Sequence, residues 1–167
     1  MRDMIGTIAS TVISLILLAL IGVYVMSGNK GGKTANFVSA VTFVQTKARE
    51  GFAQSNVGYT NFTTANAGNL ANGGDFPSML LRGGVLVDTW GNNMQLSSAA
   101  NGTQGVISFG GGGSEDVEQC KSVVLGFKDY VSLNVGGTTF TQANQPDGNS
   151  ATTACGAGAA TIALTFS

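Results

Sequence analysis

The sequence contains no histidine and little charge of either sign. Histidine is the side chain that most often acts as a general base or binds a metal near neutral pH, so its absence excludes Ser-His chemistry and histidine-based metal sites. Only 10% of the 167 residues are charged, whereas globular domains average about 25%. The acidic residues are scattered, with no convergent pair for acid–base catalysis. We therefore expect a protein that is not an enzyme and that binds no cofactor or metal.

The charge that is present is unevenly distributed. Residues 1–53 contain five basic and two acidic side chains, whereas residues 54–167 contain three basic and seven acidic ones. A phosphate backbone is bound through a broad positive surface, which residues 54–167 do not provide. We expect no general binding to nucleic acids.

Cysteine is also scarce: Cys120 and Cys155, which are 35 positions apart, are the only two. Two cysteines without histidine cannot form a four-ligand zinc site, and their spacing is not that of a redox motif. A structural disulfide is favoured, and closing this loop would stabilise the fold by roughly 3 to 4 kcal/mol. Such a bond persists in an oxidising compartment, which places this part of the protein outside the cytoplasm.

One long segment lacks charge altogether, because no charged side chain lies between Asp3 and Lys30. As a helix, Met4–Met26 would be roughly 35 Å long, and the apolar core of a bilayer is about 30 Å thick. A cleaved secretory signal has a shorter apolar core, so that alternative is disfavoured. The segment is predicted to span a membrane.

Small hydroxylated residues recur within this segment at spacings of three and four, which place Thr7, Ser10, Thr11 and Ser14 on one helical face. Such a face lets helices approach closely and form hydrogen bonds with one another in an apolar medium. We predict that it packs against copies of the same helix. The alternative is that these hydroxyls bond back to carbonyls of their own helix.

Glycine interrupts the pattern next, at Gly28, Gly31 and Gly32. Each glycine costs up to about 1 kcal/mol in a helix interior, so we expect the helix to loosen or melt there. It is predicted to resume from a cap at Thr34 or Asn36. The resumed helix has one apolar face, formed by Phe37, Val41, Val44, Ala48 and Phe52. The domain prediction is therefore a helix at residues 1–53 that docks on a globular head at residues 54–167.

The head is predicted to be α+β, with a mainly antiparallel sheet on which the long helix packs. Gln54–Gly74 and Gln142–Gly158 are expected to be irregular, with one helical turn near Ala65–Leu70. Two short helices are expected to start at Ser78 and Ser114, where serine can act as an N-cap. The predicted strands are Val85–Asp88, Met94–Ser97, Val106–Phe109, Tyr130–Val135, Thr138–Thr141 and Ala160–Phe166.

One motif points toward nucleotide hydrolysis and is disfavoured. Ser27–Thr34 nearly matches a phosphate-binding loop, and Asp88 ends an apolar strand in the way a magnesium-binding aspartate does. Serine replaces the first glycine, however, and the preceding apolar run is far too long for the buried strand that such a loop follows.

An apolar N-terminal helix, a glycine-weakened middle and an amphipathic continuation into a small head resemble the type IV pilins. Three further segments are similar to the type IVb branch: EDVEQCKSVV with Cys120, TTAC with Cys155, and the strand-like ATIALTFS. In that branch two C-terminal cysteines form a disulfide and the last strand enters the sheet of the head. VLVDTWGNNMQLS also resembles a tryptophan–glycine motif at the start of a strand in those heads.

The resemblance implies a structural subunit of a helical filament of identical copies, with the N-terminal helices in the core and the heads outside. Before assembly, the subunit would lie in the inner membrane with its head in the periplasm and would meet the pilus assembly machinery. The finished filament would carry any affinity for a cell-surface or phage receptor. Conjugation, adhesion, motility and DNA uptake all stay open as uses of the filament.

The N-terminus departs from the family pattern. Type IV pilins usually have glutamate at the fifth mature position, thought to pair with the N-terminal amine of a neighbour, whereas Ile5 stands here. If Met1 is the mature N-terminus, Asp3 would take over that pairing. The alternative is that Asp3 is a plain charge beside Arg2 at the membrane surface.

The major pilin is therefore the leading hypothesis from the sequence. Two alternatives stay open. One is a minor pilin or a type II secretion pseudopilin, and the other is a singly anchored extracytoplasmic binding domain that never polymerises.

Overall fold

The amphipathic segment that follows the glycines is helical and buries the predicted face. Residues 31–52 form a helix in which Phe37, Val41, Val44 and Ala48 are buried and Phe52 packs against the core. This prediction is confirmed. The expected cap at Thr34 or Asn36 is wrong, because the helix runs without a break from residue 31 through both positions.

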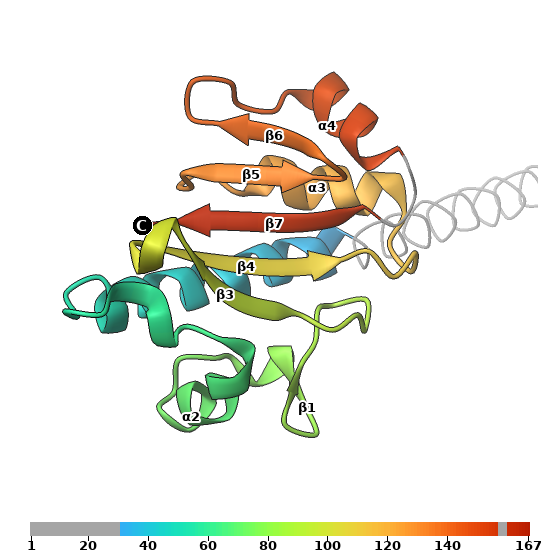
Figure 1. Cartoon of the computed structure of the whole chain (residues 1–167). Coiled ribbons are helices and arrows are strands. Elements are labelled where there is room, and N and C mark those ends of the chain that lie inside the picture. The colour runs from blue at the N-terminus through green and yellow to red at the C-terminus, as the bar shows by residue number, and fades with distance from the viewer. Residues whose placement is uncertain (1–30, 157–159) are drawn as a thin grey trace, which may run out of the picture. The chain divides into compact units, whose positions relative to one another are not determined.

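The computed structural model describes residues 31–156 and 160–167 (Figure 1). The chain divides into two compact units, Met1–Lys33 and Thr34–Ser167, and the second contains the β-sheet. Among the helices of the described residues, none is both long and apolar enough to cross a membrane. The predicted span at Met4–Met26 lies outside those residues.

The centre of the second unit is a five-stranded sheet in which all neighbouring strands are antiparallel, in the order β3-β4-β7-β5-β6. The strands are β3 (Gln95–Ala99), β4 (Gln104–Gly110), β5 (Ser132–Val135), β6 (Thr138–Thr141) and β7 (Thr161–Phe166). β7, the last strand in sequence, lies in the middle of the sheet. The predicted α+β class, the hairpin and the closing strand are all confirmed.

The core lies between one face of this sheet and the helices behind it. In register across all five strands, the inward side chains of one row are Leu96, Ile107, Leu164, Leu133 and Phe140, and all are buried. The helix at residues 31–52 and α3 (Val117–Gly126) cover this face (Figure 1). Alternation with period two therefore sends every second side chain into the core.

The segment between the long helix and β3 has more regular structure than its composition predicts. It contains η1 (Gly58–Asn61), η2 (Thr64–Asn66), α2 (Ala67–Asn72) and η3 (Ser78–Leu80). The helical turn predicted near Ala65–Leu70 is present as η2 and α2. The rest of the expected irregular loop is wrong, because short turns with local hydrogen bonds satisfy much of this backbone. The Thr64 hydroxyl also bonds both the amide and the carbonyl of Leu96, at 2.7 and 3.2 Å, which covers the outer edge of β3.

A small hairpin replaces the helix expected after Ser78. The 3₁₀ turn η3 has Pro77 at its N-cap, and β1 (Leu81–Arg82) then pairs with β2 (Val85–Leu86). Gly83 and Gly84 form the turn with φ of 58° and 81°, a backbone conformation that glycine adopts without steric cost. The predicted strand at Val85–Asp88 is thus shorter than expected.

Both C-terminal helices begin at an aspartate. Asp116 caps α3 and accepts the Gln119 amide at 2.8 Å, so the cap expected at Ser114 is wrong. Asp147 caps α4 (Gly148–Cys155), which lies in the segment expected to be irregular. Its glycine, asparagine and threonine residues are weak helix formers, so a helix there depends on its cap and on its tertiary contacts.

Candidate assembly surface

The face of the long helix turned away from the core is uncharged over most of its length. We call this the exposed stripe, formed by Ala35, Asn36, Ser39, Thr42, Phe43 and Thr46. The Thr42 hydroxyl donates to the Val38 carbonyl at 2.8 Å, and the Thr46 hydroxyl donates to the Thr42 carbonyl at 3.0 Å. Because these hydroxyls already have acceptors within the helix, the stripe can lose water without leaving them unpaired.

An apolar groove lies beside the exposed stripe, between the helix and the segment that leads into η3. Eight uncharged residues line this helix groove of about 470 Å³: Asn36, Ser39, Ala40, Phe43, Gly74, Phe76, Pro77 and Met79. Phe43 and Met79 are 42% and 44% exposed, which is high for large apolar side chains. The Lys47 ammonium lies 6.0 Å from the centre of the Phe43 ring and forms an ion pair with Glu50. The hydrogen bond from Lys47 to Glu50 raises the pKa of Lys47.

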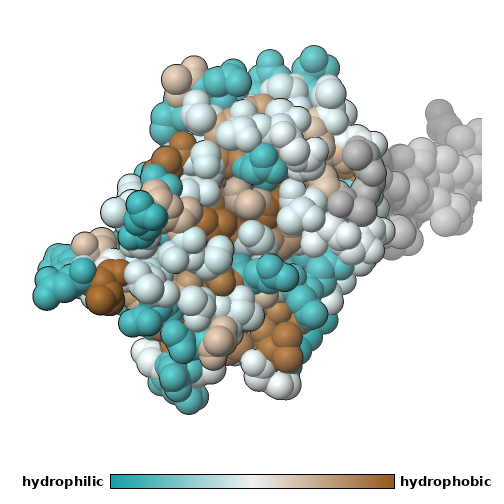
Figure 2. Space-filling view, in the orientation of Figure 1, coloured by the Kyte–Doolittle hydropathy of each residue, from teal (hydrophilic) through white to brown (hydrophobic). Residues whose placement is uncertain are grey.

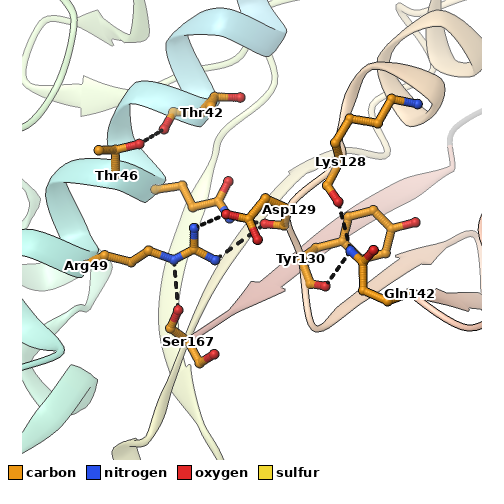
Figure 3. A network of polar contacts seen from close by, with 9 residues as sticks. Thr42, Thr46, Arg49, Lys128, Asp129, Tyr130, Gln142 and Ser167 are labelled. Atoms are coloured by element: carbon orange, nitrogen blue, oxygen red, sulfur yellow. Dashed lines mark hydrogen bonds and ion pairs between the residues drawn. The ribbon is translucent and has the colours of Figure 1, made fainter.

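The far end of the helix is fastened to the sheet by Arg49 (Figure 3). Its Nε donates to the Ser167 carbonyl at 2.8 Å, and its guanidinium forms an ion pair with Asp129. Gln45 donates to the Asp129 carbonyl from the same helix. On the other side of this loop, Gln142 donates to the carbonyls of Lys128 and Tyr130, at 2.7 and 3.0 Å. The loop from α3 to β5 is therefore held from both sides.

The disulfide joins Cys120 of α3 to Cys155 of α4, and both residues are buried. The bond joins the segments EDVEQCKSVV and TTAC, as the resemblance to type IVb pilins implied. The bond therefore ties α4, the last helix before the central strand β7, to α3.

A buried acidic cluster that the sequence did not predict links two loops. Asp88, which is fully buried, accepts hydrogen bonds from the amides of Trp90, Asn92 and Gly110, and the Asn92 side chain bridges it to Glu115. Glu115 also accepts the Gly111 amide at 2.9 Å. The magnesium-binding interpretation of Asp88 loses its basis, because these donors hold its carboxylate. The signal was present in the sequence as an aspartate after an apolar run, next to a Trp-Gly turn.

The outer face of the sheet is uncharged as well. Its two central rows across the strands are Ser97, Val106, Thr165, Ser132, Thr141 and Gln95, Ser108, Ala163, Asn134, Thr139. Figure 2 shows this face, with pale and some brown residues over much of the sheet and deeper teal mostly toward the rim. The surface can make hydrogen bonds and apolar contacts, but it offers little electrostatic attraction.

Most residues predicted for helix packing lie outside the described residues: Met1, Asp3, Ile5, Thr7, Ser10, Thr11, Ser14 and Gly28. Gly31 and Gly32 are helical and exposed, and a Cβ added at either would meet no atom within 4 Å. In the part of the chain that the structure describes, no group of three or more His, Cys, Asp or Glu side chains is placed to bind a metal.

Comparisons with known proteins agree with this arrangement. A family model with the description PilS N terminal matches residues 33–167. The crystal structure of a type IV b pilin from Salmonella typhi is similar to the chain with a TM-score of 0.59 and 17% sequence identity, over 78% of this chain and 97% of that one. No curated protein sequence matches the chain. At 17% identity the likeness to the solved structure concerns the fold alone.

Proposed function

Because the chain belongs to the PilS family and is a type IVb-like pilin, we propose that it is the major subunit of its pilus. Members of this family are structural subunits without enzymatic activity, and they assemble into extracellular pilus filaments. Membership of the family does not distinguish a major pilin from a minor pilin or a pseudopilin. The proposal is that this chain is the major subunit, which forms the bulk of the filament.

The observation that carries this proposal is the division of the long helix into two unlike faces. One face is part of the core of the head, whereas the exposed stripe is uncharged and has its threonine hydroxyls paired within the helix. A helix with such a stripe is suited to burial against neighbouring copies along most of its length. A subunit that is surrounded by copies of itself on many sides is the bulk component of a polymer.

The segment before this helix would complete the packing. In this proposal residues 1–53 act as one assembly element and residues 54–167 form the head. Thr7, Ser10, Thr11 and Ser14 would pack against sister helices, and Asp3 would pair with the amine of Met1 of a neighbour in place of a glutamate at Ile5. Local melting at Gly28, Gly31 and Gly32 would let neighbouring helices fit together.

Before assembly, the apolar run would hold the subunit in the inner membrane with the head in the periplasm, where the disulfide is stable. The pilus assembly machinery would then transfer the helix from lipid to the filament core. Uncharged outer surfaces of the heads, such as the face in Figure 2, would be available to a cell-surface or phage receptor.

Shearing of surface filaments from cells tests the proposal. We expect this chain to dominate the sheared fraction on a gel, and we expect negative-stain microscopy to show that filaments disappear when the chain is deleted. A trace band together with persistent filaments would contradict the major-subunit role and indicate a minor pilin.

Deletion of residues 1–28 separates assembly from simple anchoring. We expect a soluble, monomeric head with the Cys120–Cys155 disulfide and no filaments. A truncated chain that keeps full function would identify the N-terminal segment as a mere anchor and would contradict the proposal.

A further inference from the structure

The helix groove exposes two large apolar side chains that no described residue covers. Phe43 and Met79 remain 42% and 44% exposed on its walls, and none of the eight lining residues is charged. Large exposed apolar side chains that line a common groove are a candidate contact for another macromolecule. The groove is therefore open to a partner.

A second exposed apolar site lies beyond the C-terminal end of the long helix. The helix ends at residue 52, and the loop that follows it projects Val57, which is 54% exposed, from the uncharged segment Ala53–Val57. We call this segment the Val57 tip. From Phe43, the last helix residue that lines the groove, to Phe52 the helix rises about 14 Å, so the tip is displaced from the groove along the helix axis.

Two different complementary patches on one chain produce a head-to-tail contact, and such contacts generate an open filament when the rotation does not close. Building on the filament proposed above, we propose that the helix groove of each subunit receives the Val57 tip of a second copy displaced along the helix axis. The contact would bury Val57 against Phe43 and Met79 and would bring no charge into the groove.

The two other exposed valines among the described residues fit this role less well. Val85 is 50% exposed, but it lies directly opposite Arg82 in the β1–β2 hairpin. Val131 is 39% exposed, but it follows Lys128 and Asp129, and the Asp129 side chain is 79% exposed. Insertion of Val131 would move these charges toward an apolar groove, which costs free energy without an opposite charge to pair with them. Val57, by contrast, has only Gln54, Ser55 and Asn56 directly before it.

Cysteine cross-linking in assembled filaments tests the contact. The variant Val57→Cys/Met79→Cys, in the full-length chain with its native disulfide, should give a ladder of covalent multimers when sheared filaments are oxidised and run on a non-reducing gel. Each single variant should give no ladder, because a continuous chain of links needs both positions on every subunit. The matched control Val131→Cys/Met79→Cys should also remain monomeric.

Filaments of normal appearance in which the 57/79 pair stays monomeric would overturn the inference and leave the proposed function intact. A ladder from the 131/79 control would overturn it as well. Absence of filaments in cells that produce the wild-type chain would instead contradict the proposed function.

If the cysteine variant fails to assemble, a pair of substitutions that introduce opposite charges tests the same contact. Val57→Asp and Ser39→Lys should each reduce the amount of sheared filament, and the double variant should restore it, because the two new charges would meet across the contact. Loss in both single variants without recovery in the double variant would overturn the inference.

Discussion

The hydrogen bonds of Asp88 predict that its replacement destabilises the head. Its buried carboxylate accepts three backbone amides and the Asn92 side chain. Asp88→Asn replaces one acceptor oxygen by a donor that faces other donors, and loss of such buried bonds costs about 1 to 3 kcal/mol. We expect a clear decrease in the free energy of unfolding of the head, measured by chemical denaturation.

Asp129→Asn is the matched control for this prediction. Asp129 is 79% exposed in its ion pair with Arg49, and exposed pairs contribute about 0 to 1 kcal/mol. If the two variants were equally stable, the acidic cluster would have no role in holding the loops together.

Replacement of Tyr59, unlike that of Asp88, should not lower the free energy of unfolding. Its ring is buried between Phe52, Phe62 and Phe166, and its hydroxyl has no hydrogen-bond partner among the described residues. Removal of an unpaired buried hydroxyl relieves its desolvation cost, so Tyr59→Phe should leave the free energy of unfolding near neutral pH unchanged or raise it by about 1 kcal/mol.

The pH dependence of the same variant follows from the pKa of Tyr59, which burial raises above the usual value of 10.0. Because the folded pKa is higher than the unfolded one, the neutral phenol stabilises the fold fully below pH 10.0. That contribution is lost as the pH rises through the folded pKa. Tyrosine usually titrates between about pH 9 and pH 11. Over this range the free energy of unfolding should therefore fall more for wild type than for Tyr59→Phe. Equal losses would show that the phenol is not desolvated in the fold.

At the scale of single elements, α4 depends on the disulfide more than any other helix of the described residues. Most of its eight residues have weak helix propensity, and Asp147 holds its first turn by accepting the amides of Asn149 and Ser150. The backbone hydrogen bond from Ser150 is the main reason that the pKa of Asp147 is lowered. Cys155, at the other end, is bonded to α3.

Replacement of both cysteines by serine should lower the free energy of unfolding by roughly 3 to 4 kcal/mol, the chain-entropy value for a loop of this size. Amide hydrogen exchange should show α4 losing protection first, while β4 and β7 stay protected in the centre of the sheet. Uniform loss of protection across the sheet and α4 would contradict a local role for the bond.

The elements also show which parts of the fold the sequence could predict. The helix stripe from Phe37 to Phe52, the Gly136–Gly137 hairpin and the last strand have strong periodicity or strong turn residues, and all three were predicted correctly. One helical turn is predicted near Ala65–Leu70, where η2 and α2 lie. α4, by contrast, consists mainly of Gly, Ala, Asn, Ser and Thr residues without an apolar period, so its helical state follows from the Asp147 cap and from tertiary contacts. Local propensity alone carries no signal for such elements.

At the scale of the whole molecule, the candidate site was only partly predictable for a similar reason. The uncharged run and the cysteine pair can be read directly from the sequence. The helix groove, by contrast, combines Asn36–Phe43 with Gly74–Met79, which meet only after η1, η2 and α2 have turned the chain back to the helix. Arg49 and Asp129 likewise come together across 80 positions.

The glycine prediction can be tested on the filament itself. Gly31 and Gly32 are helical in the subunit, and a Cβ at either position meets no atom within 4 Å. Gly31→Ala/Gly32→Ala should therefore leave the head intact and strengthen the helix by up to about 1 kcal/mol per site. If assembly requires this stretch to unwind, the variant should yield fewer sheared filaments than wild type, while its amount in the membrane stays the same.

Gly51→Ala supplies the matched control, because Gly51 is also helical, exposed and free of contacts within 4 Å of an added Cβ, but lies at the opposite end of the exposed stripe. It should assemble normally, since the unwinding is proposed only near residues 28–32. Equal filament yields from both alanine variants would mean that the helix enters the filament without melting. A defect confined to Gly31→Ala/Gly32→Ala would instead tie unwinding at these glycines to assembly, because a Cβ added at either position meets no atom within 4 Å in the subunit.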